Sequence, residues 1–214
     1  MNDAACLPKF NEAFRAEFRT LLAWRRDVRR FRRDPLPDGA IESLVAMAGL
    51  APSVGNSQPW RFVHVTSPDA RDTLAAHVDA MNLRAAQTYD AARAVAYRKL
   101  KLHGLREAPA ILAVFSDEAP TAGHGLGIAT MPEMLRYSTV MAIHTLWLAA
   151  RTQGIGVGWV SILEPGIVAA LLDVPEHWSL IAILCLGYPE SPSTEPELQA
   201  KGWQDRLAVV ATER

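Results

Sequence analysis

The chain has 214 residues, half of them hydrophobic, with a net charge of −1 and a pI near 6.6. This size and composition predict a single globular domain over residues 1–214 and exclude a disordered or strongly basic chain, so we expect no nucleic-acid partner. The longest apolar stretches fall short of the roughly 20 residues that span a bilayer, so we expect no membrane segment.

The first ten residues and the cysteines are compatible with a cytoplasmic protein. Residues 1–10 include an acid and lack a basic region followed by an apolar run, so we predict no secretory signal. Cys6 and Cys185 are the only cysteines and have no spacing typical of a metal site, so we predict no bound metal. A chain of this length also needs no disulfide to be stable.

The N-terminal half begins with two helical patterns. Apolar residues at helical spacing predict an amphipathic first helix that ends near Trp24 and a second helix that ends at Gly49. Ser67 followed by Pro68 predicts a third helix start, and the helical region then extends to about residue 106. The apolar positions are Phe10, Phe14, Phe18, Leu21 and Leu22 in the first helix and Ile41, Leu44, Val45 and Ala48 in the second.

Segments rich in β-forming residues alternate with these helical patterns. Each is short and strongly apolar, which predicts buried strands, and a short helix is predicted to begin at Glu164 and Pro165. Strands bounded by helices predict a layered α+β fold. The predicted strands are residues 60–65, 110–116, 155–162 and 179–189.

Three other segments of the C-terminal half are distinctive. Residues 118–134 form a long loop, which in a compact domain is usually functional or mobile. The helix predicted over 137–154 is apolar on nearly every side, which is typical of a helix in a core or an oligomer interface, and Gly154 ends it. Residues 190–214 are predicted to form a C-terminal arm. This arm either lies across a partner subunit or has a frayed, poorly ordered end.

The stretch RRDVRRFRRDP (25–35) places one carboxylate, Asp27, among six arginines. Arg25, Arg26 and Arg29 offer several guanidinium groups within a few residues, an arrangement suited to binding a phosphate. Taken alone, such a cluster is more typical of a solvated basic surface paired with Asp34 and the acids of the first helix. A phosphate site would gain nothing from Asp27, so the carboxylate requires its own explanation.

Two further segments could contact a ligand. The loop APSVGNSQPW (51–60) crowds hydroxyl and amide side chains before a predicted strand, where they could bind a polyhydroxyl chain or a heteroaromatic edge, although an ordinary turn is the alternative. Gly154, Gly156 and Gly158 interrupt a strand and suggest that a flat group lies close to the backbone. The alternative is a packing contact that requires glycine, next to a buried serine.

Other motifs of the chain suggest no chemistry. Gly123, Gly125 and Gly127 lack the third glycine of a nucleotide-binding motif and follow no strand directly, so we predict a flexible loop. A lone histidine on an apolar helix, such as His144, is more typical of a hydrogen-bonded core residue than of a metal ligand.

Taken in order, these segments, from RRDVRRF (25–31) to LGYPE (186–190), resemble the nitroreductase-like flavoprotein superfamily. The resemblance implies an α+β fold with a central mixed β-sheet flanked by helices, in an intertwined homodimer that binds FMN at the subunit interface. The implied ligands are Arg25, Arg26 and Arg29 for the phosphate, Pro52, Ser53, Asn56, Ser57 and Gln58 for the ribityl chain and ring, and Gly158, Trp159, Val160 and Ser161 for the ring.

A narrower resemblance is to the 5,6-dimethylbenzimidazole synthase family, because ordinary nitroreductases usually carry serine at the position of Asp27. It implies that reduced FMN is the substrate and dioxygen the co-substrate, forming the lower ligand of cobalamin with erythrose 4-phosphate as the other expected product. Asp27 and Ser161 are the implied catalytic residues. Asp27 would act as a general acid or base, kept ionised by the neighbouring guanidinium groups, and Ser161 as a hydrogen-bonding group. The segments that carry this resemblance are RRDVRRF, LKLHGLREAP, GLGIATMPEMLRYSTV, GWVSIL and PELQAKGW.

The same resemblance suggests how the site is completed. Residues 91–105 are a candidate lid, and Arg206, ahead of Lys201, is the candidate phosphate contact from the C-terminal arm. No nicotinamide-binding segment is visible, so a separate flavin reductase is expected to supply reduced FMN. Two alternatives stay open: a conventional NAD(P)H-dependent FMN nitroreductase or dehalogenase, and a flavin-binding protein without catalytic activity.

Overall fold

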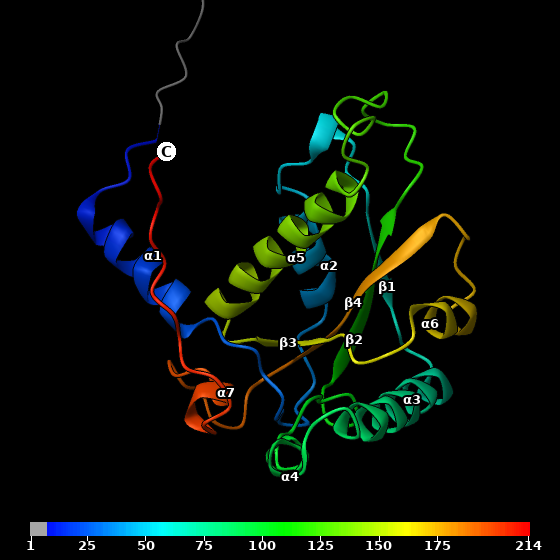
Figure 1. Ribbon diagram of the computed structural model, residues 1–214. Coiled ribbons are helices and arrows are strands. Elements are labelled where there is room, and N and C mark those ends of the chain that lie inside the picture. The colour runs from blue at the N-terminus through cyan, green and yellow to red at the C-terminus, as the bar shows by residue number, and fades with distance from the viewer. Residues whose placement is uncertain (1–7) are drawn as a thin grey trace, which may run out of the picture.

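A four-stranded sheet lies between two layers of helices in the computed structural model, which describes residues 8–214 (Figure 1). Cys6 and most of the segment considered above as a signal sequence lie outside this range. The predicted α+β architecture is confirmed. The elements are α1 Glu12–Trp24, α2 Ala40–Ala48, the 3₁₀ helix η1 Val54–Asn56, β1 Trp60–His64, α3 Pro68–Ala86, α4 Ala91–Arg98, β2 Ala110–Asp117, α5 Met134–Thr152, β3 Gly156–Val160, α6 Pro165–Leu171, β4 Trp178–Gly187 and α7 Glu197–Ala200.

The strand order is β1-β2-β4-β3, and each neighbouring pair of strands is antiparallel. The expectation of a mixed sheet is therefore wrong for the four strands. In the described part of the chain, one isolated bridge between Asp27 and Val157 is the only parallel pairing. The edge strand β1 is also less buried than predicted, because Trp60–Val63 are half-buried and His64 is exposed.

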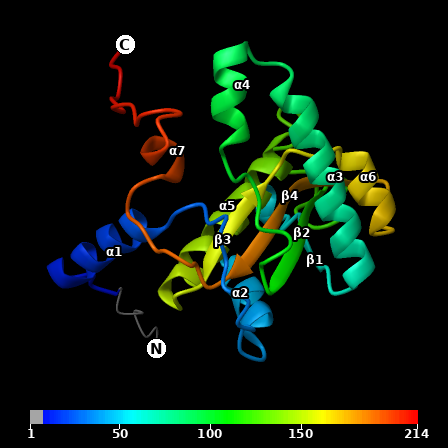
Figure 2. The ribbon, with the colours of Figure 1, turned by 90° about the horizontal axis from the view of Figure 1, so that it is seen from below.

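Alternating residues of the central strands β2 and β4 divide the core between the two faces of the sheet. Leu112 and Leu184 pack on the side of α2 and α5, whereas Ile111 and Ile183 pack on the side of α3 and α6. The two layers lie on opposite sides of the sheet in Figure 2. This period of two explains why both central strands contain apolar residues at almost every position.

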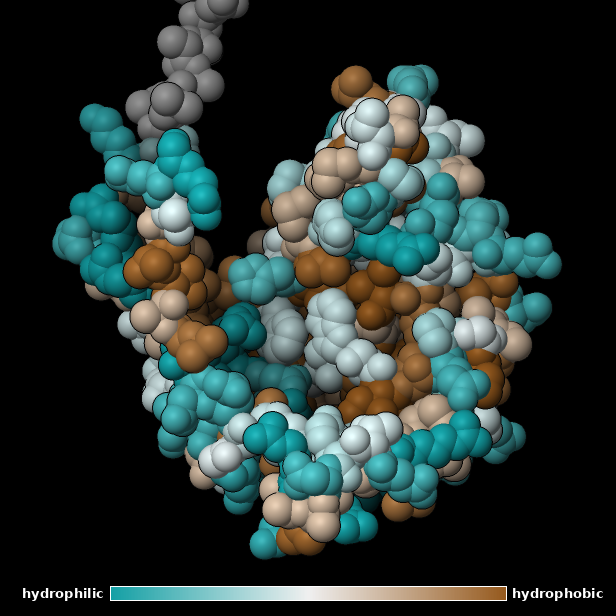
Figure 3. Space-filling model, in the orientation of Figure 1, coloured by the Kyte–Doolittle hydropathy of each residue, from teal (hydrophilic) through white to brown (hydrophobic). Residues whose placement is uncertain are grey.

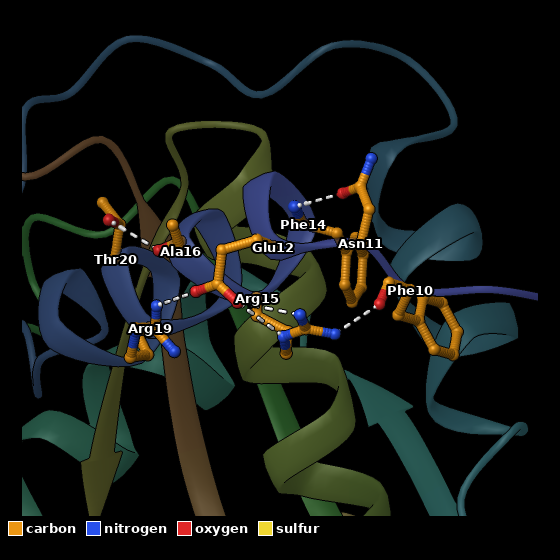
Figure 4. A network of polar contacts seen from close by, with 8 residues as sticks. All are labelled: Phe10, Asn11, Glu12, Phe14, Arg15, Ala16, Arg19 and Thr20. Carbon is orange, nitrogen blue, oxygen red and sulfur yellow. Dashed lines mark hydrogen bonds and ion pairs between the residues drawn. The ribbon is translucent and has the colours of Figure 1, made fainter.

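Helix boundaries follow local capping chemistry. The Asn11 side chain accepts a hydrogen bond from the backbone N–H of Phe14 at 2.9 Å and begins α1, and Glu12 pairs with Arg15 and Arg19 on its surface (Figure 4). The predicted helical region after Ser67 is divided in two, because Asp90 caps a separate helix, α4, and residues 99–106 are not helical.

Residues 99–106, which form turns and irregular chain, lie against the body of the protein. A Cβ atom at Gly104 would lie 2.5 Å from the ring of Phe31, so the chain passes closely over that buried side chain. The apolar helix α5 begins three residues earlier than predicted and ends before Gly154, which adopts a left-handed φ of +75°.

The segment after β4 packs on its own chain at least as far as Trp203. The Trp203 ring makes edge contacts with Tyr89 at 5.5 Å and Tyr97 at 6.1 Å, on and just before α4. An arm across a partner subunit therefore stays a prediction. No helix in residues 8–214 has the length and apolarity needed to cross a membrane.

Candidate functional site

Asp27 lies on an extended segment that adds to the edge of the sheet next to β3. The backbone N–H of Val28 donates to the carbonyl oxygen of Val157 at 3.0 Å. The Asp27 side chain turns toward the same strand, where Oδ1 accepts a hydrogen bond from the backbone N–H of Trp159 at 2.8 Å. Its other oxygen, Oδ2, accepts from Arg29 Nε at 2.9 Å and pairs with Arg29 Nη2 at 2.6 Å. Asp27 thus faces strand β3 and one arginine.

Glycines on β3 allow this approach. A Cβ atom at Gly156 would lie 2.7 Å from the Val28 side chain, and one at Gly158 would overlap the carbonyl oxygen of Val28. Gly156 therefore accommodates the Val28 side chain and Gly158 the Val28 carbonyl group, which explains the absence of side chains here without a ligand. Gly154 has a different role, at the end of α5. The packing contact considered from the sequence is therefore present on β3, although Ser161, expected to be buried beside it, is exposed.

The protonation of Asp27 reflects a balance between burial and its partners. Burial raises the pKa of the Asp27 carboxyl above its ordinary value, while the Arg29 guanidinium and the Trp159 N–H oppose the rise and Glu197 adds to it. Arg29 thus favours the ionised form, as the sequence predicted, but burial outweighs it and the net shift of the pKa is upward. A raised pKa suits a group that exchanges protons near neutral pH.

A cavity of about 270 Å³ lies beside Asp27, between the segment after α1 and the chain around α7. Figure 3 shows a hollow between α1, at the left, and the main body, with hydrophilic residues along its lower part. Cationic side chains outnumber acids in the cavity lining. The charged lining residues are Arg26, Asp27, Arg29, Arg30, Arg151, Glu195, Glu197 and Lys201.

Four arginines in or near this cavity form no ion pair within residues 8–214: Arg25, Arg26, Arg151 and Arg206. The Arg25 guanidinium lies 5.1 Å from the centre of the Trp147 ring. Arg26 donates from Nε to the Thr194 carbonyl oxygen at 2.7 Å. Burial lowers the pKa of Arg26, and the charges of Arg206 and Arg25 lower that pKa further. Arg25, Arg26 and Arg206 are close enough to repel one another, which favours an anion among them.

Arg29 differs from Arg25, Arg26 and Arg206. Nε and Nη2 contact Asp27, and Nη1 donates to the carbonyl oxygen of Lys101 at 3.4 Å. Its side chain is only 13% exposed. The structure therefore places Arg29 on the carboxylate and not in the unpaired cationic cluster.

The polar loop (residues 51–60), which was predicted to contact a ligand, lies near the start of α5, whereas the arginines beside the cavity lie near its end. The backbone N–H of Val54 donates to Ser138 Oγ at 3.0 Å, near the start of this helix, whereas Trp147 near its end contacts Arg25 and Arg26. Ser138 and Trp147 are nine positions apart in this helix, a rise of about 13.5 Å. One copy of the chain therefore does not bring the polar loop to Asp27.

Within the polar loop, hydrogen bonds of Ser53, Asn56 and Gln58 join these residues to one another. Asn56 and Gln58 adopt left-handed φ values of +55° and +47°, and the Gln58 N–H donates to Ser53 Oγ at 3.0 Å. Ser57 Oγ is buried without a hydrogen-bond partner among the described residues. Pro52, Asn56 and Gln58 are exposed.

The glycine-rich loop within residues 118–134 supports this polar loop, a role that we missed in the sequence. A Cβ atom at Gly123 would lie 2.7 Å from the carbonyl oxygen of Gly55, and one at Gly127 would lie 2.9 Å from the Val54 side chain. Both glycines adopt left-handed φ values, +80° and +82°. The spacing of glycines in GHGLG was the available signal, because glycine is required where two backbones meet.

The four residues predicted to line a ring do not all face outward. Gly158 lies under Val28, and Val160 is in the core, whereas Trp159 is half-buried and Ser161 is exposed. Ser161 follows Trp159 by two positions, about 7 Å along an extended chain. Asp27 and Ser161, the two predicted catalytic residues, are therefore brought to the same end of β3.

Comparisons with known proteins agree with this architecture. The family model described as "Nitroreductase family" matches residues 22–188. The chain is 54% identical over 199 residues to a 5,6-dimethylbenzimidazole synthase of Rhodospirillum rubrum, with 93% of this chain and 94% of the relative covered. It is 47% identical over 198 residues to a protein of the same name from Rhodobacter capsulatus, with 92% and 96% covered.

Solved structures with the same fold are more distant in sequence. An iodotyrosine deiodinase bound to FMN and 3-iodo-L-tyrosine has a TM-score of 0.74 and 24% identity, with 92% of this chain and 98% of that chain covered. A BluB-like flavoprotein from Clostridium difficile 630 has a TM-score of 0.64 and 22% identity, with 86% and 96% covered.

Proposed function

The chain belongs to the nitroreductase family, and we propose that it is a 5,6-dimethylbenzimidazole synthase, which fragments reduced FMN with dioxygen. The observation that carries the proposal is the position of Asp27, a carboxylate fixed to β3 beside a cationic cavity and close to Ser161. Relatives named as this synthase match the chain at about half of its positions over nearly its whole length.

The unpaired arginines fit the phosphate of FMN. Arg25, Arg26 and Arg206 lie near one another without a carboxylate partner in the described residues, and Lys201 lines the adjacent cavity. A bound phosphate would offset the repulsion among these cations and accept several hydrogen bonds from their guanidinium groups. The phosphate ligands that we propose are therefore Arg25, Arg26 and Arg206, with Lys201 at the rim.

A second copy of the chain is proposed to complete the site. Ser53, Asn56 and Gln58 are far from Asp27 within one copy, as described above, yet they present polar groups suited to the ribityl chain and the ring. Their display on an exposed loop is explained if the loop reaches the cavity of a two-fold-related partner.

The surface of the chain supports this homodimer. Phe10, Phe14 and Phe18 on and next to α1 are 56%, 45% and 43% exposed. Met141 and Val140 of α5 are also exposed. Figure 3 shows hydrophobic residues both on α1 and across the hollow on the main body. Such apolar surface on two facing elements is typical of a covered interface.

Reduced FMN supplies an electron-rich ring that reacts with dioxygen. Asp27 is proposed to take or return a proton during the fragmentation, and its raised pKa places the two protonation states closer in energy at neutral pH. Ser161 can hydrogen-bond the ring edge. The segment from Ala91 to Leu105 is proposed to cover the cavity, which limits access of water to the reacting atoms.

The source of reduced FMN is proposed to be a separate flavin reductase in the cytoplasm. No segment of the sequence resembles a nicotinamide-binding motif. The site also holds the flavin as a substrate that departs as products, so the protein needs a fresh reduced molecule for each turnover.

The proposal is tested by aerobic incubation of the protein with excess chemically reduced FMN, followed by detection of dimethylbenzimidazole by mass. We expect product with wild type and none with Asp27→Asn or without dioxygen. Rapid, repeated NAD(P)H oxidation with a nitroaromatic acceptor and no benzimidazole would support a conventional nitroreductase. Flavin binding without either activity would support a storage protein.

A further inference from the structure

We propose that Arg29 is a positioning residue that orients Asp27, and that it is not a ligand of the flavin phosphate. The inference rests on the proposed function only where it gives Asp27 a part in the reaction. The contact between the two side chains is a property of the protein without flavin.

The hydrogen-bonding capacity of Arg29 is directed inward. Nε and Nη2 reach Asp27 Oδ2 at 2.9 and 2.6 Å, and Nη1 reaches the Lys101 carbonyl oxygen at 3.4 Å. Each guanidinium nitrogen therefore already has an acceptor within the chain. To bind a phosphate through a bidentate fork, Arg29 would have to release Asp27, which would leave a partly buried carboxylate without its cation.

The backbone around Arg29 is also held in place. A Cβ atom at Gly104 would lie 3.2 Å from the Arg29 carbonyl oxygen and 2.5 Å from the Phe31 ring, so residues 99–106 pass tightly over this segment. The buried ring of Phe31 fixes the chain two residues after Arg29. Arg29 thus connects Asp27 to the segment that follows α4.

The two oxygens of Asp27 have separate partners as a result. Oδ1 is held by the Trp159 N–H and Oδ2 by Arg29, so the carboxylate cannot rotate without losing a contact. Proton transfer requires a group held within hydrogen-bond reach of its target. A fixed carboxylate plane is the contribution that we assign to Arg29.

Other charged groups around Asp27 do not duplicate this contact. Cys185 on β4 stays a neutral thiol, because burial raises its pKa to about 12. Glu197 on α7 has the same charge as Asp27 and raises its pKa. The remaining charged residues that line the cavity with Asp27 are Arg26, Arg30, Arg151, Glu195 and Lys201.

The chain offers a matched control for loss of this arginine. Arg32 pairs with Asp34 at 2.8 Å with the same spacing of two residues, but both side chains are more than half exposed. Arg32→Met removes the same charge from the same segment and leaves the Asp27 pair intact. A general effect of net charge should therefore appear in both variants.

The experiment measures the Asp27 titration and flavin affinity separately in the full-length protein. The carboxyl carbons of aspartate are labelled with ¹³C, and the Asp27 signal is identified by its loss in Asp27→Asn. We expect Arg29→Met to raise the Asp27 pKa by about one unit or more, a tenfold change in proton affinity, whereas Arg32→Met should not. FMN affinity should change by less than about threefold in Arg29→Met and fall by about tenfold or more in Arg26→Met.

Arg29→Lys tests the same idea if Arg29→Met does not fold. Lysine keeps the charge but lacks the planar fork, so the Asp27 pKa should rise less than in the methionine variant, with FMN affinity again unchanged. An unshifted Asp27 titration in the folded variants would overturn the inference. A loss of FMN affinity as large as that of Arg26→Met would also overturn it. Neither readout uses turnover, so a wild-type protein that forms no benzimidazole would remove only the proposed function.

Discussion

Asp27 and Trp159 are 132 positions apart in the chain, and the Asp27 carboxylate accepts a hydrogen bond from the Trp159 backbone N–H at 2.8 Å. This contact joins the segment after α1 to strand β3. It holds the Asp27 carboxylate at Trp159, which precedes Ser161 by two residues. Gly158 lies between Val157 and Trp159, the two β3 residues that bond to the segment of Asp27 and Val28. A side chain at Gly158 would overlap Val28, so the contact depends on its absence.

Asp27→Asn should abolish formation of dimethylbenzimidazole while FMN still binds. Asparagine can present its oxygen to Trp159 or to Arg29 but not to both, so we expect the free energy of unfolding to fall by about 1–3 kcal/mol. Product yield is measured across a titration of reduced FMN, alongside the flavin binding constant. A return of near wild-type yield at saturating flavin would show that Asp27 is structural only.

Asp27 should also make stability and activity depend on pH. Its pKa is raised in the folded protein, so above the ordinary value of 3.8 the folded state binds more protons than the unfolded state, and stability falls as pH rises through the folded-state pKa. Denaturant unfolding of wild type and Asp27→Asn between about pH 4 and 8 isolates this dependence, which the variant should lack. If Asp27 acts as a base, product formation should rise with pH over the same window. A constant stability difference between the two proteins would contradict the raised pKa.

Arg26→Ala should weaken FMN binding by about tenfold or more, because it removes a charged ligand from the proposed phosphate cluster. The remaining affinity should also depend less on salt. Equilibrium titrations at low and high ionic strength check both effects. Arg84→Ala is the matched control, since Arg84 forms an exposed pair with Glu164 far along the chain. Equal losses in both variants would argue against a specific phosphate ligand.

Phe14→Asp should produce a monomer with poor affinity for FMN. The substitution places a charge in the exposed aromatic row of α1, and a monomer would lack the polar loop of its partner. Light scattering gives the mass, and fluorescence titration gives the affinity. Leu83→Asp, on an exposed position of α3, should leave both unchanged. A wild-type protein that is monomeric with FMN bound would refute the shared site.

Gly158→Ala should destabilise the fold by about 1–3 kcal/mol, because the new methyl group would overlap the carbonyl oxygen of Val28. The contact between Asp27 and Trp159 should be disturbed as well. Gly166→Ala in α6 is the control, since no atom lies within 4 Å of its Cβ position, and alanine is the better helix former. Denaturant unfolding compares the two, and equal stabilities would contradict the packing described for β3.

Much of the fold was predictable from local patterns. The Phe10–Phe18 repeat, the Ser67-Pro68 cap and the apolar runs around Leu112 and Leu184 each specify one element through contacts close in sequence. The flavin site and the interest of Asp27 and Ser161 were implied by a family resemblance, whereas the signals for these elements came from the residues themselves. These signals are local, because capping and periodicity act within a few residues.

Tertiary structure decided what the local patterns left open. The sequence could not distinguish glycines that face a ligand from Gly156 and Gly158, which accommodate Val28 across the sheet edge. It also grouped Arg29 with Arg25 and Arg26, although only Arg29 turns to Asp27. Neither distinction is local: the packing of Val28 on β3 places Asp27 beside Trp159 and partly buries it, and this burial raises its pKa.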